Sequence, residues 1–279
     1  MKEIRLTSRH MEDFIRQLKL EEKSPYTIQK YTHDIKDFLA YTGETPVCKE
    51  LAIDYKQDLI RRGYQTGTVN SMISSVNSFL RFLKLDEIRV RHIRTQQKIY
   101  CPEEKELTKA EYIRLLEAAR PKPRLYMIIE TICATGIRIS ELKYFTVEAV
   151  TRGEVVVSCK NKTRNILLPA KLRKKLMKYS RRQGIREGVI FRTRSGRPMD
   201  RSNIWLSMKK LCQSANVMAS KVFPHNLRKL FARTFYNIEK DIAKLADLLG
   251  HSNINTTRIY IMTTSMEHRR KIDKMGLVV

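Results

Sequence analysis

The sequence is poor in acidic residues and has no long apolar run. Among 279 residues there are 29 aspartates and glutamates against 55 lysines and arginines, which gives a net charge of +26. No apolar run approaches the roughly 20 residues of a membrane-spanning helix, and the N-terminus lacks the apolar centre of a secretion signal. We therefore expect a soluble protein that works in the cytoplasm and does not contact a membrane.

The five cysteines show no regular spacing. Their number is odd, and no two of them form a Cys-x-x-Cys pair. Disulfide frameworks and structural zinc sites need paired or closely spaced cysteines. We therefore expect neither, and we expect the cysteines to be reduced thiols.

The excess of positive charge is the strongest signal in the composition. A field of this size attracts a polyanion over a large surface, and contacts from Lys and Arg to phosphates supply most of the non-specific affinity for nucleic acid. An acidic membrane is the rival partner. It is disfavoured because the charge is spread along the chain and no lipidation signal is present.

The first hundred residues show only helical periodicity. Ser24 is a good N-cap, and Pro25 suits the first position of the helix that follows. Four amphipathic helices are expected, over residues 8–20, from Ser24 onward, and over 50–62 and 68–84. Four short helices of this kind predict a compact bundle, which we place at residues 1–90.

The periodicity breaks off near residue 88. Residues 91–106 are polar and mostly basic, contain Pro102, and are expected to link two domains. Such a linker either lies across a DNA backbone or is a solvated connector, and both interpretations stay open.

Residues 107–279 combine helices with a little β-structure. Two apolar runs flank a polar turn, which predicts a β-hairpin over 154–168, and a short strand is expected at 189–191. Helices are expected over 108–120, 124–134, 170–183, 201–214, 225–238, 241–249 and 254–262. The chain is thus predicted to be mainly α, with a helical N-terminal domain and a mixed α+β second domain that contains a small sheet.

Two clusters of charged side chains lie in the first part of the second domain. Arg138 and Glu141 follow a glycine at the expected start of a helix. A helix N-terminus favours phosphate, an arginine can bond two phosphate oxygens at once, and Glu141 can hold that arginine in place. Lys160 lies in the hairpin turn, from which it can reach a DNA groove. Taken singly, a surface salt bridge and a solvated basic loop are the commoner explanations.

Two further clusters lie near the C-terminus. His225 and Arg228 share one face of a helix, so that one can transfer a proton while the other binds a phosphate. His251 follows a glycine that ends a helix, and Tyr260 comes nine residues later. A solvent-facing pair and a core tyrosine are the commoner explanations of each cluster alone. Together, and in this order, the groups form a complete set for phosphoryl transfer.

The order and spacing of these clusters resemble the tyrosine recombinases, the lambda-integrase-type family that includes the bacterial Xer recombinases. The runs ATGIRISEL, FPHNLRKLFA and LLGHSNINTTRIY are similar to the family's sequence boxes, within a resemblance that covers about residues 107–279. The run SPYTIQKYTHDIKDFLAY resembles the family's SAM-like core-binding domain more loosely. The chain is therefore similar to the minimal two-domain members.

The resemblance implies a role for each matching residue. Arg138 and Arg228 would bind the scissile phosphate, and His251 would add a hydrogen bond to it. Tyr260 would attack phosphorus, which gives a 3′-phosphotyrosine link and a free 5′-hydroxyl. A free tyrosine has a pKa near 10, so this attack needs a base and a cationic setting.

Further residues complete the implied site. His225 would accept the tyrosine proton, and Lys160 would protonate the leaving 5′-oxygen. Because the hairpin turn is one residue shorter than in the family pattern, Lys162 competes with Lys160, which we prefer. Glu141 stands where the family has an acid that supports the catalytic residues. Lys229 departs from the pattern, since many members have histidine there.

The resemblance implies a site-specific DNA recombinase that serves integration, excision or inversion of a DNA element. The covalent link conserves the phosphodiester energy and cationic side chains replace a metal ion, so no cofactor and no metal are expected. The expected partner is double-stranded DNA, on which a homotetramer forms through contacts of the tail 264–279. Accessory DNA-bending proteins or a partner recombinase are further candidates, and a bacterial, nucleoid-associated location is implied.

Two other functions share parts of this pattern. A DNA-binding regulator on the same scaffold needs no catalytic residues, yet every catalytic position is filled. A type IB topoisomerase-like enzyme shares the chemistry, but the separate helical domain and the tail after Tyr260 favour a recombinase.

Overall fold

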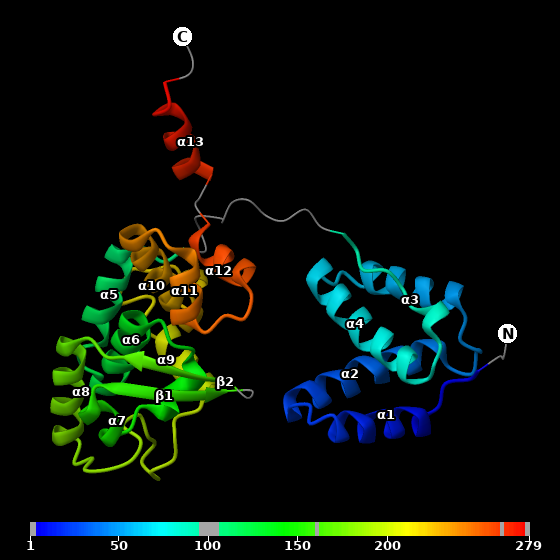
Figure 1. Cartoon of the computed structure of the whole chain (residues 1–279), viewed down its shortest axis with the longest axis horizontal. Helices are drawn as coiled ribbons and strands as arrows, with labels where there is room; N and C mark the ends of the chain where they lie inside the picture. The colour runs from blue at the N-terminus through cyan, green and yellow to red at the C-terminus, as the bar shows by residue number, and fades with distance from the viewer. Residues whose placement is uncertain (1–3, 95–105, 160–161, 263–264, 277–279) are drawn as a thin grey trace. The chain divides into compact units, whose positions relative to one another are not determined.

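The computed structural model describes residues 4–94, 106–159, 162–262 and 265–276. The chain divides into two units, Met1–Gln97 and Lys98–Val279 (Figure 1). Each unit buries an apolar core of its own. Within the described residues, no helix is both long and apolar enough to cross a bilayer.

The described residues of the first unit, 4–94, form four helices and a short 3-10 turn. They are α1 (Ser8–Leu20), α2 (Pro25–Thr42), α3 (Lys49–Arg61), α4 (Thr66–Phe82) and η1 (Asp86–Ile88). These are the four helices that the apolar spacing predicts. Ser24 caps α2, and Pro25 occupies its first turn. The apolar faces meet in a core that includes Phe14, Phe38 and Phe79.

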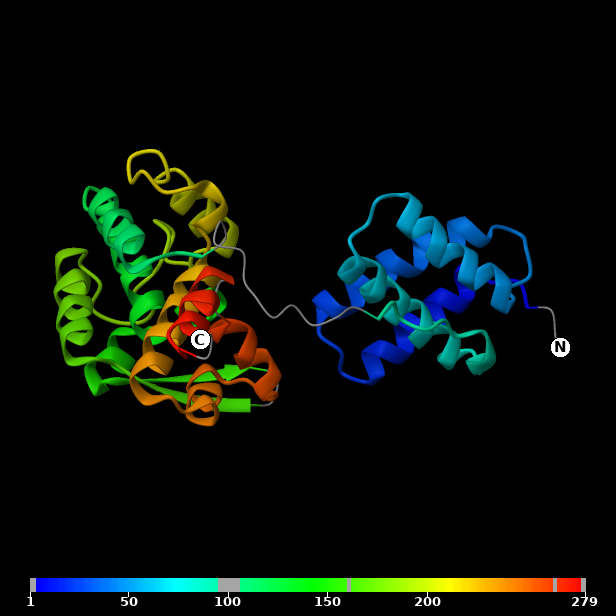
Figure 2. The ribbon, with the colours of Figure 1, turned by 90° about the horizontal axis from the view of Figure 1, so that it is seen from above.

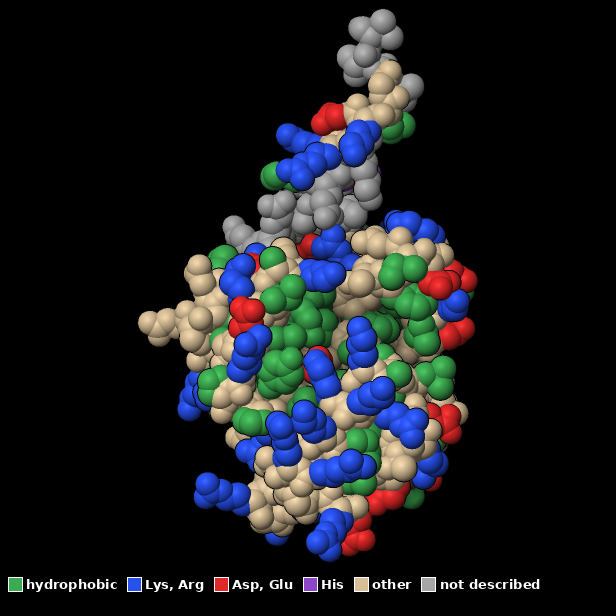
Figure 3. Space-filling view, turned by 90° about the vertical axis from the view of Figure 1, so that its left-hand side faces the viewer, with side chains coloured by type: hydrophobic (Ala, Val, Ile, Leu, Met, Phe, Trp, Pro, Cys, Tyr) green, Lys and Arg blue, Asp and Glu red, His purple; other side chains and the backbone are tan. Residues whose placement is uncertain are grey.

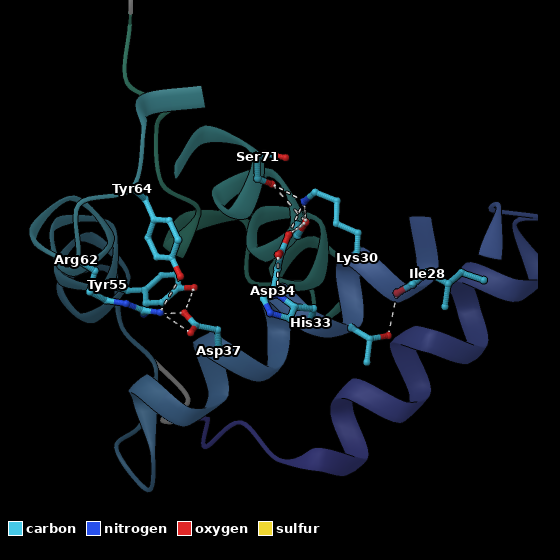
Figure 4. Close-up of polar contacts among 11 residues, drawn as sticks. Ile28, Lys30, His33, Asp34, Asp37, Tyr55, Arg62, Tyr64 and Ser71 are labelled. Carbon is cyan, nitrogen blue, oxygen red and sulfur yellow. Dashed lines mark hydrogen bonds and ion pairs between the residues drawn. The ribbon is translucent and has the colours of Figure 1, made fainter. Parts of the chain in front are cut away.

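Two polar clusters tie the helices of the first unit together (Figure 4). Lys30 of α2 binds Asp34 on the same helix and donates to Ser75 Oγ of α4 at 3.0 Å. Asp37 of α2 accepts two hydrogen bonds from Arg62, at 2.9 and 2.8 Å. Because Asp34 is buried, its carboxylate needs such partners, and these contacts fix α2 against α4 and the end of α3.

An extended segment after η1 is bound along α4 by two asparagines. Asn77 donates to the carbonyl of Val90 at 2.8 Å and accepts from its N–H at 2.9 Å. Asn70 does the same with Ile93, at 2.9 and 2.8 Å. The two asparagines lie two turns apart on one face of α4. We call residues 89–94 the strap.

Lysines of α3 hold the other side of the strap. Lys49 donates to the carbonyl of Arg89, and Lys56 donates to the carbonyl of Arg91 at 3.4 Å. Residues 91–94 of the expected linker therefore belong to the first unit, and most of the remaining linker lies outside the described residues. The periodicity did not reveal the strap, because side-chain groups and not a helix or sheet satisfy its peptide groups.

In the described part of the second unit, helices are combined with one antiparallel sheet of two strands. The hairpin lies beside α11 in both views (Figures 1 and 2). In it Val157 pairs with Arg164, and Cys159 pairs with Lys162. The elements are α5 (Lys109–Ala119), α6 (Pro123–Thr135), η3 (Ile139–Tyr144), α7 (Val147–Arg152), β1 (Glu154–Cys159), β2 (Lys162–Leu167), α8 (Ala170–Arg182), α9 (Arg201–Lys209), η4 (Ala219–Lys221), α10 (Pro224–Glu239), α11 (Ile242–Leu249), α12 (Ile254–Ile261) and α13 (Ser265–Asp273). This mainly α architecture with one small sheet confirms the predicted fold class.

Two expected elements differ from the structure. The prediction of a strand at 189–191 is wrong. In the described chain, Val189 forms a single bridge with Thr146. Ile190 and Phe191 are buried in the core, but no strand lies beside them with which they could form a sheet. The helix predicted over 201–214 ends at Lys209, and the chain continues in turns.

A small apolar cluster joins α10, α11 and α12. It contains Ala232, Leu245, Leu249 and Tyr260. Gly250 ends α11 in a left-handed conformation with φ of 64°. The cluster therefore fixes Tyr260 next to the C-terminal end of α11, where the predicted site residues meet.

Candidate active site

The turn between α6 and η3 brings Arg138 to the site. α6 ends at Gly136, whose φ of 62° is a conformation that glycine adopts without strain. Arg138 follows as the cap of η3, where its backbone N–H and Nη1 donate to the two oxygens of Glu141 at 2.7 and 3.0 Å. The Glu141 side chain is 3% exposed, so it holds Arg138 from inside the fold.

Three arginines meet at the C-terminal end of α11. The carbonyls of residues 248–250 each accept a hydrogen bond from a different arginine: the first from Arg164, the second from Arg228 at 2.6 Å, and the third from Arg138 at 3.2 Å. The last carbonyls of a helix lack partners within it and carry partial negative charge. They gather three like-charged groups in one place, and we call these three arginines with carbonyls 248–250 the arginine cradle.

Arg228 is the most deeply buried member of the cradle. Its residue is 2% exposed, and its Nη1 donates to the carbonyl of Gly136 at 2.6 Å. Burial, and after it the positive charge of Arg138, lowers the pKa of Arg228 to about 10, so the side chain stays charged at neutral pH. Its Nε is buried and has no hydrogen-bond partner within the described residues, which leaves one donor unused.

Arg164 is a further member of the site that the sequence motifs did not indicate. Its side chain is 14% exposed, and Nη2 lies 2.6 Å from Oε2 of Glu141. Paired residues of an antiparallel hairpin point to the same face of the sheet, and the partner of Arg164 is the buried Val157. An arginine opposite a buried valine, at an inward position of the predicted hairpin, is the signal that reveals it.

His251 joins the cradle to α12. Its Nε2 lies 2.9 Å from Nη2 of Arg228, and its Nδ1 lies 2.9 Å from Oγ1 of Thr257. Because an arginine only donates, Nε2 accepts, and Nδ1 carries the proton and donates to Thr257. Burial, followed by the charges of Arg228, Arg138 and Arg164, lowers the pKa of His251 to about 4. The imidazole is therefore neutral at pH 7.

Tyr260 packs beside two histidines. Its hydroxyl is 3.4 Å from Nδ1 of His225, and its ring centroid is 4.9 Å from that of His225 and 5.1 Å from that of His251. The guanidinium carbon of Arg228 lies 5.8 Å from the ring of Tyr260. Burial, followed by the charges of Arg228 and Lys229, lowers the pKa of His225. A neutral imidazole therefore faces the hydroxyl at neutral pH.

The side chains of the two lysines that the sequence suggests as proton donors both lie outside the described residues. Lys160 lies outside the described residues, and Lys162 begins β2 but its side chain lies outside them too. Lys229 is 9% exposed and lies 3.0 Å from Glu106, so an acid at the start of the second unit balances its charge. Within the described part of the chain, no group of His, Cys, Asp or Glu side chains is arranged to hold a metal ion.

Comparison with known proteins identifies the family. The family model for phage integrases matches residues 105–267. The chain belongs to the phage integrase family. A second model, the N-terminal SAM-like domain of phage integrases, matches residues 11–87 of this integrase. The two matches fall in the two structural units, one in each.

Relatives and solved structures cover nearly the whole integrase. Tyrosine recombinase XerA from Thermococcus kodakarensis is 30% identical, over 96% of this chain and 95% of the relative. A lambda integrase dimer bound to a COC′ core site is 16% identical with a TM-score of 0.75, over 91% of this chain and 95% of that chain. A lambda integrase tetramer bound to a Holliday junction is 16% identical with a TM-score of 0.72, over 91% of this chain and 77% of that chain. The integrase is thus a tyrosine recombinase, an enzyme of site-specific DNA recombination.

Proposed function

We propose that this integrase cleaves and rejoins DNA through a covalent bond to Tyr260. One observation carries the proposal. Arg138, Arg228, His251 and Tyr260 come from separate parts of the chain and meet at the end of α11. Fixed cations aimed at developing charge usually give the largest contribution to catalysis, and a DNA phosphate is the anion that suits this place.

In the proposed reaction, the oxygen of Tyr260 attacks phosphorus and its proton passes to Nδ1 of His225. The bond from phosphorus to the 5′-oxygen breaks, and this oxygen takes a proton from Lys160, which leaves a 3′-phosphotyrosine. Rejoining reverses these steps with the 5′-hydroxyl of a second strand. Lys162 is the alternative donor, and alanine variants of the two lysines distinguish them.

Arg138 and Arg228 would bind the phosphate oxygens, whose charge grows as Tyr260 attacks. His251 would donate to one of them only if its Nε2 carries a proton. Nε2 now accepts from Arg228, and Nδ1 carries the proton. Arg228 therefore has to turn this Nη2 group toward the phosphate, and the imidazole has to change tautomer, so that Nε2 carries the proton and Nδ1 accepts from Thr257. The proposed chemistry therefore includes a small rearrangement within the cradle when DNA binds.

The two units would divide the work on DNA. We assign core binding to residues 1–90, linkage to 91–106 and catalysis to 107–279, with subunit contacts from the tail 264–279. In that tail the apolar side chains of Ile272 and Met275 are 52% and 60% exposed. The partner would be double-stranded recombination sites bound by a homotetramer, as with the lambda integrase tetramer on its Holliday junction. Accessory DNA-bending proteins or a partner recombinase, and a bacterial cytoplasmic, nucleoid-associated location, belong to the same proposal.

Positive charge extends beyond the cradle. Figure 3 shows Lys and Arg side chains spread over the face of the second unit on which α8 lies. More than half of the 13 residues of α8 are lysine or arginine. Phosphate contacts supply much of the affinity of such surfaces for DNA, so a cradle variant can lose cleavage and still bind DNA.

A nicked duplex tests the proposal. Duplexes that the protein binds are first selected from a random pool. A nick is then placed a few nucleotides from the bond that Tyr260 attacks. Cleavage releases the short fragment that carries the 5′-hydroxyl, and its loss prevents rejoining. We expect the wild type to form a covalent complex that survives denaturation. Tyr260→Phe should bind the duplex and form none, whereas Tyr236→Phe, a neighbour of the same apolar cluster, should trap normally. Trapping by Tyr260→Phe would refute the assignment of the nucleophile.

A further inference from the structure

Arg164 is the member of the cradle to which the proposed chemistry gives no role. It donates from Nη1 to the carbonyl of Leu248 and from Nη2 to Glu141. The chain leaves room for it, since a Cβ on Gly250 would lie 2.6 Å from its Cδ and 3.0 Å from its Nε. The side chain is therefore built into the site and is not a surface arginine that happens to lie nearby.

Glu141 is shared between two arginines. Oε1 accepts from Nη1 of Arg138, while Oε2 accepts from the backbone N–H of Arg138 and from Nη2 of Arg164. A buried carboxylate that faced Arg138 alone would form a one-to-one pair with it and cancel its charge. With Arg164 present, the carboxylate is divided between two guanidinium groups, and Arg138 keeps a net positive charge.

The charges of the whole cradle agree with this argument. Its three guanidinium groups and the one carboxylate of Glu141 leave two positive charges. A phosphodiester under attack by a phenolate carries two negative charges in total. Without Arg164, the site would hold one positive charge fewer than the reacting group holds negative ones.

We propose that Arg164 is a positioning residue for DNA cleavage, which keeps Arg138 charged and directed at the phosphate by taking up half of the Glu141 carboxylate. The inference rests on the proposed function. A purely structural role is the competing explanation, in which Arg164 only fastens the hairpin to the end of α11. The chain offers a control away from the cradle, because Arg173 also donates to a carbonyl, that of Thr151 near the end of α7, and its Nη1 lies 3.6 Å from a Cβ built on Gly153.

The test measures the single-turnover rate of covalent-complex formation on the nicked duplex at saturating protein. Arg164→Met should slow it about 10- to 100-fold with DNA affinity unchanged, as expected for misplacement of a binding group. Arg164→Lys, which keeps the charge, should recover most of the rate. Arg173→Met should cleave like the wild type, because Arg173 donates to a carbonyl outside the cradle.

A double-mutant cycle separates positioning from structural support. In the Glu141→Gln background the uncharged amide cannot neutralise Arg138, so adding Arg164→Met should cost less than about threefold in rate. The same slowing in both backgrounds, or a wild-type rate for Arg164→Met, overturns the inference. If Arg164→Met does not fold, failure of Arg164→Lys to exceed the rate of Arg164→Gln overturns it instead. Failure of the proposed function would show differently, as trapping by Tyr260→Phe.

Discussion

Replacing Gly136 with alanine perturbs the turn that leads from α6 into the cradle. Gly136 has φ of 62°, and a Cβ built on it would lie 2.7 Å from Cε1 and 3.0 Å from Cγ of the Phe231 ring. Both distances are shorter than van der Waals contact. The carbonyl of Gly136 also accepts from Arg228 at 2.6 Å, so any shift of this turn moves a hydrogen bond of the site.

Gly184 is the matched control for this substitution. It has nearly the same conformation, with φ of 64°, and nothing lies within 4 Å of a Cβ built on it. Gly184→Ala should therefore cost only the strain of a left-handed alanine, about 1 kcal/mol after the entropy lost by the unfolded chain is counted. Gly136→Ala should cost about 1–3 kcal/mol more, because the Phe231 ring has to move in a packed cluster.

Unfolding of the second unit can be followed through Trp205, the single tryptophan of the chain. We expect Gly184→Ala to lower Tm by about 2–4 °C and Gly136→Ala by about 4–16 °C. Gly136→Ala should also slow formation of the covalent complex, while Gly184→Ala should not. Equal losses of Tm at the two positions would refute the argument from the Phe231 contact.

Further predictions concern salt, pH and the strap. The logarithm of DNA affinity should fall linearly with that of salt concentration, by about 0.9 per phosphate contact, and a flat response would contradict phosphate-dominated binding. Because burial and then nearby arginines lower the pKa of His251 to about 4 from 6.5, the unfolded chain binds the proton more tightly. Urea unfolding should thus show stability falling as pH drops from about 6.5 to 4, and His251→Gln should flatten that fall. Asn70→Ala should speed hydrogen exchange of the Ile93 amide, and Asn77→Ala that of the Val90 amide. If each variant also speeds exchange at the other amide, the strap is released as a whole.

The helices of the first unit can be predicted because their signals are local. The apolar spacing of residues 8–20 and the pair Ser24 and Pro25 determine where α1 and α2 form. The predicted strand at 189–191 fails for the opposite reason. An apolar run shows that a segment is buried, but whether another strand lies beside it depends on distant parts of the chain.

In the candidate site too, some groups can be predicted from the local sequence and others depend on distant parts of the chain. Arg138, Arg228, His251 and Tyr260 are found from the sequence because their order and neighbours resemble a family. The carbonyls of 248–250, which gather the arginines, are main-chain groups and have no sequence signature. Contacts between segments, such as that of His251 with Arg228, follow from the fold and not from spacing.

Arg164 could be predicted from the sequence in part. The hairpin was predicted, and strand alternation places its single arginine on the inward face, so the position was accessible to sequence reasoning. Its partners were not, since Glu141 precedes the hairpin and Leu248 lies far beyond it in the chain. A charged residue at an inward position is the kind of local conflict that points to a functional site.

The strap determines where the chain can be truncated after the first unit without loss of stability. A fragment ended at residue 87, where the match to the SAM-like domain stops, would lose the apolar side chain of Val90 and leave the buried amide of Asn77 without its peptide partner. A fragment that continues to Arg94 keeps both asparagine contacts. For this protein the stable boundary of the domain lies several residues beyond the boundary of the sequence family.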